Sequence, residues 1–323
     1  MPKPRRHSPA REARKRWLAV IGIALFIAVD ILLVVLALQS TSARDNGSTP
    51  AVVPTSSESS RPTPTASPTP TDAAPSSVTA VPPTRILAAL DASVAWRATT
   101  GSCPDTAVAP ELTIDGGATW SSADLTGLTG VTALQRILVT DADTATFLGS
   151  GAECDPAVAR TFVGGADFAE YPDQLEGSWY LSPVGGSTVH APGGDVAAPC
   201  DATVTVAPLG DDTAAVLCSD SSLHVTTDAG ASWSTLDELP GAVALTDSAD
   251  GFLVASAGSA GCAGVELTLI GVDDDRTPVD CVESSIPAGD LAGSTAIDWT
   301  DGAIWVWVDD RLLISTDDGG SWS

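Results

Sequence analysis

An eight-residue phrase recurs three times in this chain of 323 residues: TIDGGATW at 113–120, TTDAGASW at 226–233 and STDDGGSW at 315–322. The shared pattern, Ser/Thr-x-Asp-x-Gly-x-Ser/Thr-Trp, specifies five positions, which chance would match on the order of once in 10⁵ windows. The copies begin 113 and 89 residues apart. The shorter spacing equals two units of about 44 residues, which is the length of one four-stranded propeller blade.

The sequence predicts a series of short strands in the rest of the region 85–323. Alternating runs such as ATVTVAP (202–208), GFLVASAG (251–258) and AIWVWVDD (303–310) are separated by Gly, Asp and Pro. Val, Thr, Ile and Trp favour a pleated, half-buried surface, and runs of this length at steady spacing are typical of all-β folds. No helix longer than two turns is predicted. The repeat favours a β-propeller among the all-β folds.

Each residue of the phrase suits a hairpin turn. Asp accepts hydrogen bonds from nearby backbone N–H groups, Gly supplies a backbone angle that other residues resist, and Trp buries a large apolar face. We therefore interpret the phrase as structural, with no catalytic role. Its positions are Thr113, Asp115, Gly117, Thr119 and Trp120; Thr226, Asp228, Gly230, Ser232 and Trp233; and Ser315, Asp317, Gly319, Ser321 and Trp322.

The phrase resembles the Asp box, or bacterial neuraminidase repeat, of sialidases, sortilin-like receptors and proteins described as photosystem II stability/assembly-factor-like. The resemblance implies an Asp-box β-propeller in which the box joins the third and fourth strands of a blade, on the face away from the ligand. With this template we expect about five four-stranded blades, six or seven being possible. The expected blades are 84–126, 130–182, 201–238, 241–286 and 291–323. Residues 173–179 are interpreted as a box remnant and 184–200 as an insertion.

Three segments precede this domain. Residues 1–16 hold seven basic side chains, and residues 17–38 are apolar except for Asp30. Twenty-two helical residues extend roughly 33 Å, enough to cross a bilayer core of about 30 Å. Basic residues on the N-terminal side predict a single-pass anchor with its N-terminus inside the cell. Residues 39–84 contain nine Pro and 19 Ser or Thr, a composition that predicts a disordered linker.

Two alternatives concern the anchor. A signal peptide cleaved near Thr41-Ser42-Ala43 would have a shorter apolar region of about 7–15 residues, so we favour the uncleaved anchor. Asp30 lies near the middle of the span, where a carboxylate costs about 2.5–3.5 kcal/mol on insertion scales. It either makes a polar contact with another membrane helix or is outweighed by the surrounding apolar residues.

The expected domain is strongly acidic. Residues 85–323 contain 36 Asp and Glu against six Arg and no Lys, a net charge of −30. Such a surface repels nucleic acid. Six cysteines in this part predict three disulfides in an oxidising compartment, with 15 possible pairings. We favour the sequential pairing, and no cofactor or metal site is expected. The expected pairs are Cys103–Cys154, Cys200–Cys218 and Cys262–Cys281.

Catalytic alternatives rest on weaker signals. Resembling sialidases use an arginine triad, a Tyr–Glu nucleophile pair and an Asp acid, and Glu170-Tyr171 superficially suggests that pair. However, Arg85-Ile86 is followed by Leu87 in place of the family's proline. The run Asp273–Asp275 lacks the spaced ligands of a calcium loop. The sequence spacing suggests no partner for His190 or His224. No nucleophile elbow and no phosphate-binding loop occur in the sequence. The domain's arginines are Arg85, Arg97, Arg136, Arg160, Arg276 and Arg311.

These inferences predict a propeller displayed outside a bacterial cell that binds or assembles with a protein or glycan, without catalysis. The alternatives are a sialidase-like glycoside hydrolase or glycan-binding protein, and a purely structural envelope component. We expect the binding surface on the face that carries the blade-to-blade connections and the insertion 184–200. Deletion of 186–196 is expected to spare folding and remove binding.

Overall fold

The computed structural model describes residues 78–323 apart from 105–107, 184 and 301. The chain divides into two compact units, Met1–Pro68 and Thr69–Ser323, and the described residues belong to the second. The predicted span 17–38, Asp30 and the linker up to residue 77 lie outside the described residues. Within the described part, no helix has both the length and the apolar character needed to cross a membrane.

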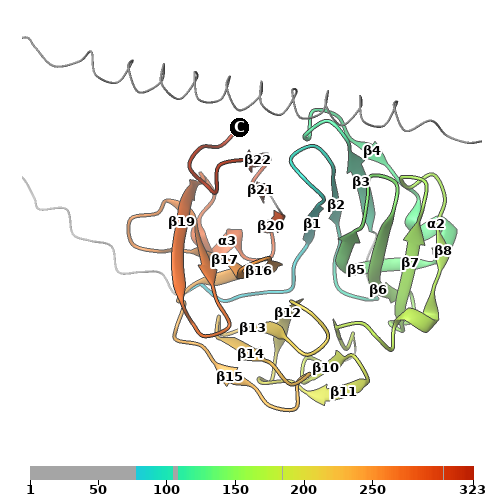
Figure 1. Ribbon diagram of the computed structural model, residues 1–323, viewed down its shortest axis with the longest axis horizontal. Coiled ribbons are helices and arrows are strands. Elements are labelled where there is room, and N and C mark those ends of the chain that lie inside the picture. The colour runs from blue at the N-terminus through green and yellow to red at the C-terminus, as the bar shows by residue number, and fades with distance from the viewer. Residues whose placement is uncertain (1–77, 105–107, 184, 301) are drawn as a thin grey trace, which may run out of the picture. The chain divides into compact units, whose positions relative to one another are not determined.

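Six antiparallel sheets follow one another around a centre, so the domain is a six-bladed β-propeller (Figure 1). The expectation of about five blades was therefore one too low. Four sheets have four strands, and the third and sixth have three. The blades are β1 (Arg85–Ala89), β2 (Ala95–Thr99), β3 (Ala109–Thr113) and β4 (Ser121–Ser122); β5 (Val131–Val139), β6 (Ala145–Gly151), β7 (Pro156–Thr161) and β8 (Ala169–Glu170); β9 (Tyr180–Leu181), β10 (Thr188–Ala191) and β11 (Gly194–Ala197); β12 (Thr203–Pro208), β13 (Ala214–Cys218), β14 (Leu223–Thr226) and β15 (Ser234–Thr235); β16 (Ala242–Ser248), β17 (Gly251–Ala257), β18 (Gly264–Ile270) and β19 (Arg276–Glu283); and β20 (Ala296–Thr300), β21 (Ala303–Val308) and β22 (Arg311–Ser315).

The core lies between neighbouring blades. Alternate residues of each strand point to opposite faces of the sheet, and the inner and second strands bury both faces. Apolar clusters join the first blade to the second, the third to the fourth, the fourth to the fifth, the fifth to the sixth and the sixth to the first. Among the described residues no such cluster joins the second blade to the third. That boundary is therefore the exception in the ring.

The ring closes between the sixth and first blades through specific bonds. The inner strands β20 and β1 run parallel: Thr84 N donates to Gly293 O at their starts, and Thr300 Oγ1 donates to Leu90 O at their ends. Trp305, fully buried, donates through Nε1 to Asp91 O at 3.0 Å. Closure therefore rests on packing and on backbone and side-chain hydrogen bonds across a blade boundary.

The third blade corrects the sequence-based division. Residues expected to form an insertion are its strands β10 and β11, paired by the register Val189 to Val196. Val189 is fully buried and Ala191 nearly so. The Gly-rich stretch around Gly193 and Gly194 is the hairpin turn, where both residues have positive φ angles of 96° and 141°. Deletion of 186–196 would therefore remove two strands and should unfold the blade, contrary to the earlier expectation.

The innermost strand of the third blade, β9, runs antiparallel to β12, the innermost strand of the fourth blade. Trp179, just before β9, donates through Nε1 to Gly210 O beyond the end of β12, whereas Gly186 O, after β9, accepts from Thr203 N at the start of β12. Before β9, at the point in the chain where the other blades form their first strand, the chain forms the 3₁₀ helix η1 (Pro172–Gln174). Pro172 disfavours a strand there. The third blade thus lacks the strand that begins the other blades.

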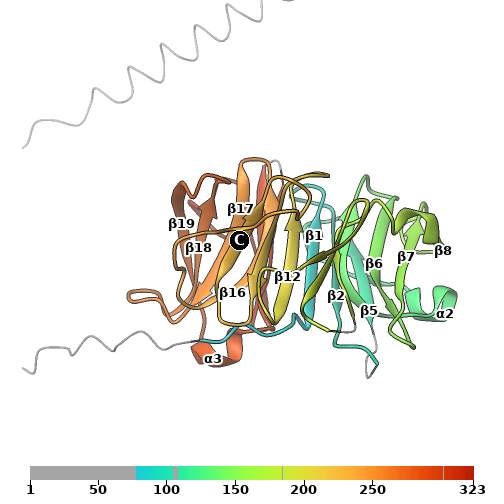
Figure 2. The same ribbon diagram turned by 90° about the horizontal axis from the view of Figure 1, so that it is seen from below.

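The ring has two faces. The connection face carries the blade-to-blade connections with α2 (Leu125–Thr129) and α3 (Ala288–Leu291), which lie on the same side in Figure 2. The repeat face carries the turns 114–120, 227–233 and 316–322. Residues 78–84, assigned to the linker by composition, cross the connection face as a strap: Ala80 N donates to Ser219 O, and Ser221 Oγ donates to Val78 O.

Three disulfide bonds are confirmed, and they connect the cysteines in sequential order. Cys103–Cys154 joins the β2–β3 loop of the first blade to the β6–β7 turn of the second, with a Cα–Cα distance of 5.6 Å. Cys200–Cys218 fixes the approach to β12, and Cys262–Cys281 lies within the fifth blade. Each has at least one cysteine in a loop or connection of the connection face, which is therefore the cross-linked side of the ring.

Candidate functional site

The three repeated phrases form one and the same turn after the third strand of their blades. In the first, Asp115 Oδ1 accepts from Thr113 Oγ1 at 2.9 Å and from Thr119 N at 2.8 Å, while Oδ2 accepts from Thr119 Oγ1 at 2.6 Å. Thr113 Oγ1 also accepts from Gly117 N at 2.9 Å. The other two copies repeat these bonds within about 0.1 Å.

These hydrogen bonds occupy both oxygens of the Asp carboxylate in each turn. Donation from the hydroxyl of Thr119, Ser232 or Ser321 is the largest cause that lowers the pKa of Asp115, Asp228 and Asp317 respectively. A carboxylate that already accepts several local hydrogen bonds is poorly placed to act as an acid or a ligand. The geometry of the turns is therefore that of a structural element.

Two of the three tryptophans donate a hydrogen bond to the preceding blade, whereas Trp120 Nε1 donates to Gly117 O of its own turn. Trp233 Nε1 donates to Ala197 O of the third blade, and its ring meets Trp179 edge-on at 6.4 Å. Trp322 Nε1 donates to Asp280 Oδ2 of the fifth blade at 2.6 Å. All three rings are half-buried, whereas the sequence predicted burial against their own blade. The turns therefore join neighbouring blades as well as ending a hairpin.

A fourth, degenerate copy of the turn escaped the sequence search. Thr161 Oγ1 accepts from Gly165 N at 2.9 Å and from Val163 N at 3.3 Å, as Thr113 does from Gly117 and Asp115. The phrase TFVGGADF at 161–168 keeps the Thr and Gly but has Val for Asp and Phe for Trp. The predicted remnant 173–179 is not a turn of this kind; its Trp179 is buried at the start of β9.

The centre of the ring holds a cavity of ≈300 Å³ lined by the inner strands. Its charged lining residues are Arg85, Arg136, Asp247 and Asp298. Asp298 Oδ2 accepts from Ala89 N at 2.8 Å, and its Oδ1 accepts from Thr246 Oγ1 at 3.3 Å. Nothing in the sequence pattern marked these two acids, because each stands singly within an ordinary strand.

Enclosure by the ring controls the ionisation of the central cluster. Desolvation, opposed by hydrogen bonds and reinforced by the nearby Asp247, raises the pKa of Asp298 to about 7. Desolvation also raises the pKa of Asp247, although the positive charge of Arg136 opposes this. The pKa of Arg136 is lowered for the same reason, since removal from water disfavours every charge.

A second cavity of ≈220 Å³ opens on the connection face, where the third blade lacks a strand. The strap residues Pro82 and Pro83, the loop around Ser102, and the inner strands β5, β9 and β12 line it. Gln135 and Arg136 line both cavities. The side-chain amide of Gln135 is hydrogen-bonded to β9: Nε2 donates to Leu181 O, and Oε1 accepts from Leu181 N, both at 2.8 Å.

The residues of the sialidase alternative do not come together. Arg97 pairs with Glu111 at 2.8 Å, Arg160 lies over Phe162 and Tyr171, and Arg311 donates to Glu283 O. Arg85 donates to Asp309 O and lies over Trp307, and of the six arginines Arg85 and Arg136 line the central cavity. Glu170 ends β8 on the outer edge of the second blade. An arginine triad around one cavity is thus not formed by the described residues.

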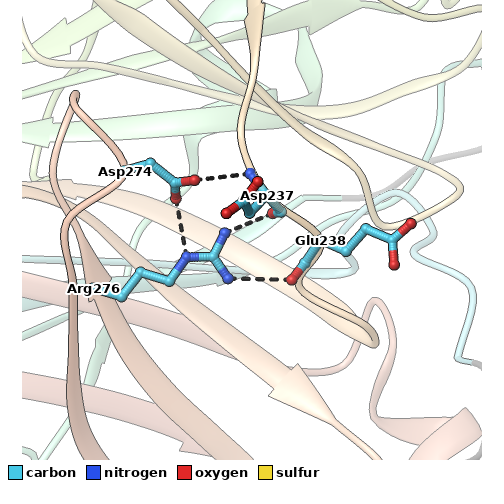
Figure 3. A network of polar contacts seen from close by, with 4 residues as sticks. All are labelled: Asp237, Glu238, Asp274 and Arg276. Carbon is cyan, nitrogen blue, oxygen red and sulfur yellow. Dashed lines mark hydrogen bonds and ion pairs between the residues drawn. The ribbon is translucent and has the colours of Figure 1, made fainter.

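The acidic run 273–275 is a hairpin tip that ties two blades together. Asp274 Oδ1 accepts from Arg276 Nε at 2.9 Å and its Oδ2 accepts from Asp237 N, while Arg276 donates to the carbonyls of Asp237 and Glu238 (Figure 3). Within the described part, no group of three or more His, Cys, Asp or Glu is arranged to hold a metal ion.

The two histidines of the domain have partners that their spacing did not reveal. His190 Nδ1 lies 2.7 Å from Asp195 Oδ1, and the ring stacks on Tyr180 at 4.4 Å. His224 contacts the hydroxyls of Ser222 and Thr235, both at 3.1 Å. Burial lowers the pKa of His224, so the neutral ring is favoured. Both histidines belong to cross-strand pairs.

No protein-family model and no curated protein matches the sequence. Among solved structures, the chain is similar to YCF48 from Cyanidioschyzon merolae, with 14% identity over 78% of this chain and 72% of that one and a TM-score of 0.28. It is similar to the GH74 xyloglucanase from Xanthomonas campestris, with 19% identity, 74% and 37% coverage and a TM-score of 0.29. The six-bladed lectin from Aleuria aurantia shows 12% identity, 76% and 96% coverage and a TM-score of 0.46. Binding proteins, lectins and glycoside hydrolases share this fold.

Proposed function

We propose that this chain is a binding module that holds a ligand or partner on its connection face and catalyses no reaction itself. The observation that carries the proposal is the cavity of ≈220 Å³ beside the third blade. A preformed hollow with apolar walls and few polar groups is the usual form of a ligand site. The disulfide Cys103–Cys154 beside it holds the first two blades in fixed register, which favours binding without rearrangement.

The setting of this module follows from its cysteines and its N-terminal sequence. Three disulfide bonds suggest that the domain lies outside the cytoplasm. We propose that the span 17–38 anchors it with the N-terminus inside and the propeller outside a bacterial cell. Its partner is then a protein or glycan met outside the cell, and Asp30 is the residue available for contact with another membrane helix. Co-purification of membrane proteins with the full chain, compared with Asp30→Leu, tests that contact.

The binding proposal can be tested with one variant on each face. Ser102 is exposed at the lip of the cavity, so Ser102→Trp should block it. Ile114 is 66% exposed on the repeat face, so Ile114→Trp adds the same bulk elsewhere. The full chain in detergent would be screened against immobilised glycans and peptides. We expect binding that Ser102→Trp abolishes and Ile114→Trp preserves. Binding lost only in Ile114→Trp would place the site on the other face and refute the proposal.

A second candidate function, glycoside hydrolysis, has one specific observation in its favour. Asp298, with its pKa raised to about 7, and Asp247, whose pKa desolvation also raises, both line the central cavity. Glycosidases use a pair of carboxyl groups, one of which has a raised pKa and acts as the general acid. Turnover of a panel of chromogenic glycosides, sialosides included, that disappears in Asp298→Asn would replace the binding proposal with this one.

A further inference from the structure

The cavity on the connection face contains a single charged side chain. Its lining includes residues from the strap, from the loop around Ser102 and from the first strands of the second to fourth blades. Of the described residues that line it, only Arg136, which also lines the central cavity, is ionisable, although residues 85–323 carry a net charge of −30. A positively charged lining residue in so acidic a domain favours an anionic group as the ligand.

The guanidinium of Arg136 has donors to spare. It makes one long hydrogen bond, from Nη1 to Trp179 O at 3.4 Å. Within the described residues it forms no ion pair, since the three pairs found involve other residues. Desolvation lowers the pKa of Arg136, and the negative charge of Asp247, on the side of the central cavity, opposes this shift. A planar guanidinium offers five N–H donors in a fork that matches a carboxylate.

The remaining walls define the body of the ligand. Pro82, Pro83, Leu181, Val204 and Val206 supply apolar surface, and Ser102 and Thr205 supply hydroxyls. The amide of Gln135 is not available, because both its ends bond Leu181. The volume of ≈220 Å³ is below the range of about 300–1,000 Å³ that is usual for drug-sized ligands, so the occupant is small.

We propose that this cavity binds a monocarboxylate with a compact apolar body, whose carboxylate pairs with the guanidinium of Arg136. The proposal rests on the binding function inferred above and names the chemistry of its ligand. A free small acid and an acidic group projecting from a larger molecule share this chemistry. A cation is excluded by Arg136, and a dianion would meet one guanidinium and the repulsion of the surrounding acids.

Isothermal titration of the full chain with three probes of similar size but different charge tests the proposal: benzoate, benzamide and benzylammonium. We expect benzoate to bind about tenfold or more tightly than benzamide, and benzylammonium not to bind. Arg136→Gln should lower benzoate affinity about tenfold or more, and Ser102→Trp should abolish binding. Circular dichroism and thermal melts check that each variant is folded. If Arg136→Gln does not fold, Ser102→Trp and the comparison of the three probes still test whether the cavity binds a carboxylate.

Equal affinity for benzoate and benzamide, or unchanged benzoate binding in folded Arg136→Gln, would overturn the proposal. So would failure of benzoate, propionate and phenylacetate to bind at about 10 mM. The same acids, immobilised through a spacer, separate a free ligand from a projecting group: capture of the chain indicates the latter. If the screen above finds a glycan or peptide that binds independently of Arg136 but is blocked by Ser102→Trp, the binding function stands and only this ligand chemistry fails.

Discussion

Gln135 of β5 holds Leu181 of β9 by two hydrogen bonds of 2.8 Å, one to its carbonyl and one from its N–H. This side chain does what a neighbouring strand would do, because it satisfies both backbone groups of a residue on an inner edge. The third blade has no parallel inner strand to do so. The relationship therefore allows a blade of three strands to complete the ring and leaves a cavity beside it.

The first prediction concerns this pair. Gln135→Ala would leave the N–H and C=O of Leu181 without partners, which should lower the free energy of unfolding by about 2–4 kcal/mol. Gln135→Glu keeps only the acceptor and should fall between. Urea denaturation of the full chain measures the effect. Gln174→Ala in η1, away from the inner strands, is the matched control, and an equal loss in both variants would contradict the role given to Gln135.

The repeated turns predict a moderate effect of their tryptophan. Trp233 is half-buried, so about 100 Å² of buried ring at about 25 cal/mol per Å² corresponds to about 2–3 kcal/mol. We expect Trp233→Ala to lose that amount and Trp233→Phe to lose less, because Phe keeps the contact with Trp179 but not the bond to Ala197 O. Thermal unfolding of both variants checks the order, which an unchanged melting temperature in Trp233→Ala would contradict.

Asp298 predicts a pH dependence of stability. Its folded pKa, about 7, is raised from 3.8, so the folded state binds the proton more tightly than the unfolded state. This contribution is fully present below about pH 3.8 and is lost as pH rises through about 7. The groups facing Asp298 are Asp247 and Thr246 on β16, Ala89 N on β1, and Arg136 across the cavity.

Asp298→Asn keeps the neutral form at every pH. Between pH 5 and pH 8 the variant should therefore gain about 2–3 kcal/mol of stability relative to the unmodified chain. Denaturant titrations at both pH values measure this difference, in which the titration of the other carboxylates largely cancels. A difference that does not change with pH would mean that Asp298 is ionised throughout.

The disulfides predict a ranking by loop length. Cys103–Cys154 spans 51 residues and Cys200–Cys218 spans 18. In the chain-entropy account, paired Ser substitutions should cost about 4 and about 3 kcal/mol respectively. Because Cys103–Cys154 also borders the proposed ligand cavity, its removal should weaken ligand binding, whereas removal of Cys262–Cys281 in the fifth blade should not. Denaturation of the first two double variants tests the ranking, and ligand titration of the Cys103/Cys154 and Cys262/Cys281 double variants tests the effect on binding.

The three copies of one phrase were enough to predict the all-β propeller, because the side-chain hydrogen bonds that shape each turn lie within its eight residues. The hydroxyl of Thr226, the carboxylate of Asp228 and the hydroxyl of Ser232 bond within the turn, so their pattern is visible in the sequence. The count of blades did not follow in the same way. The degenerate turn at Thr161 keeps its geometry with two of five positions, and the third blade contains no copy at all.

The candidate sites were decided by tertiary structure alone. Gln135 and Leu181 are 46 residues apart, and Ala89 and Asp298 are 209 apart. No local spacing marks such partners, since they meet only after the ring has closed. The sequence by itself determined the turns, whose hydrogen bonds are local, and the acidic charge, which is compositional. The fold decided which single arginine and which two acids are partly withdrawn from water at the centre of the ring, because burial depends on what the other blades place around them.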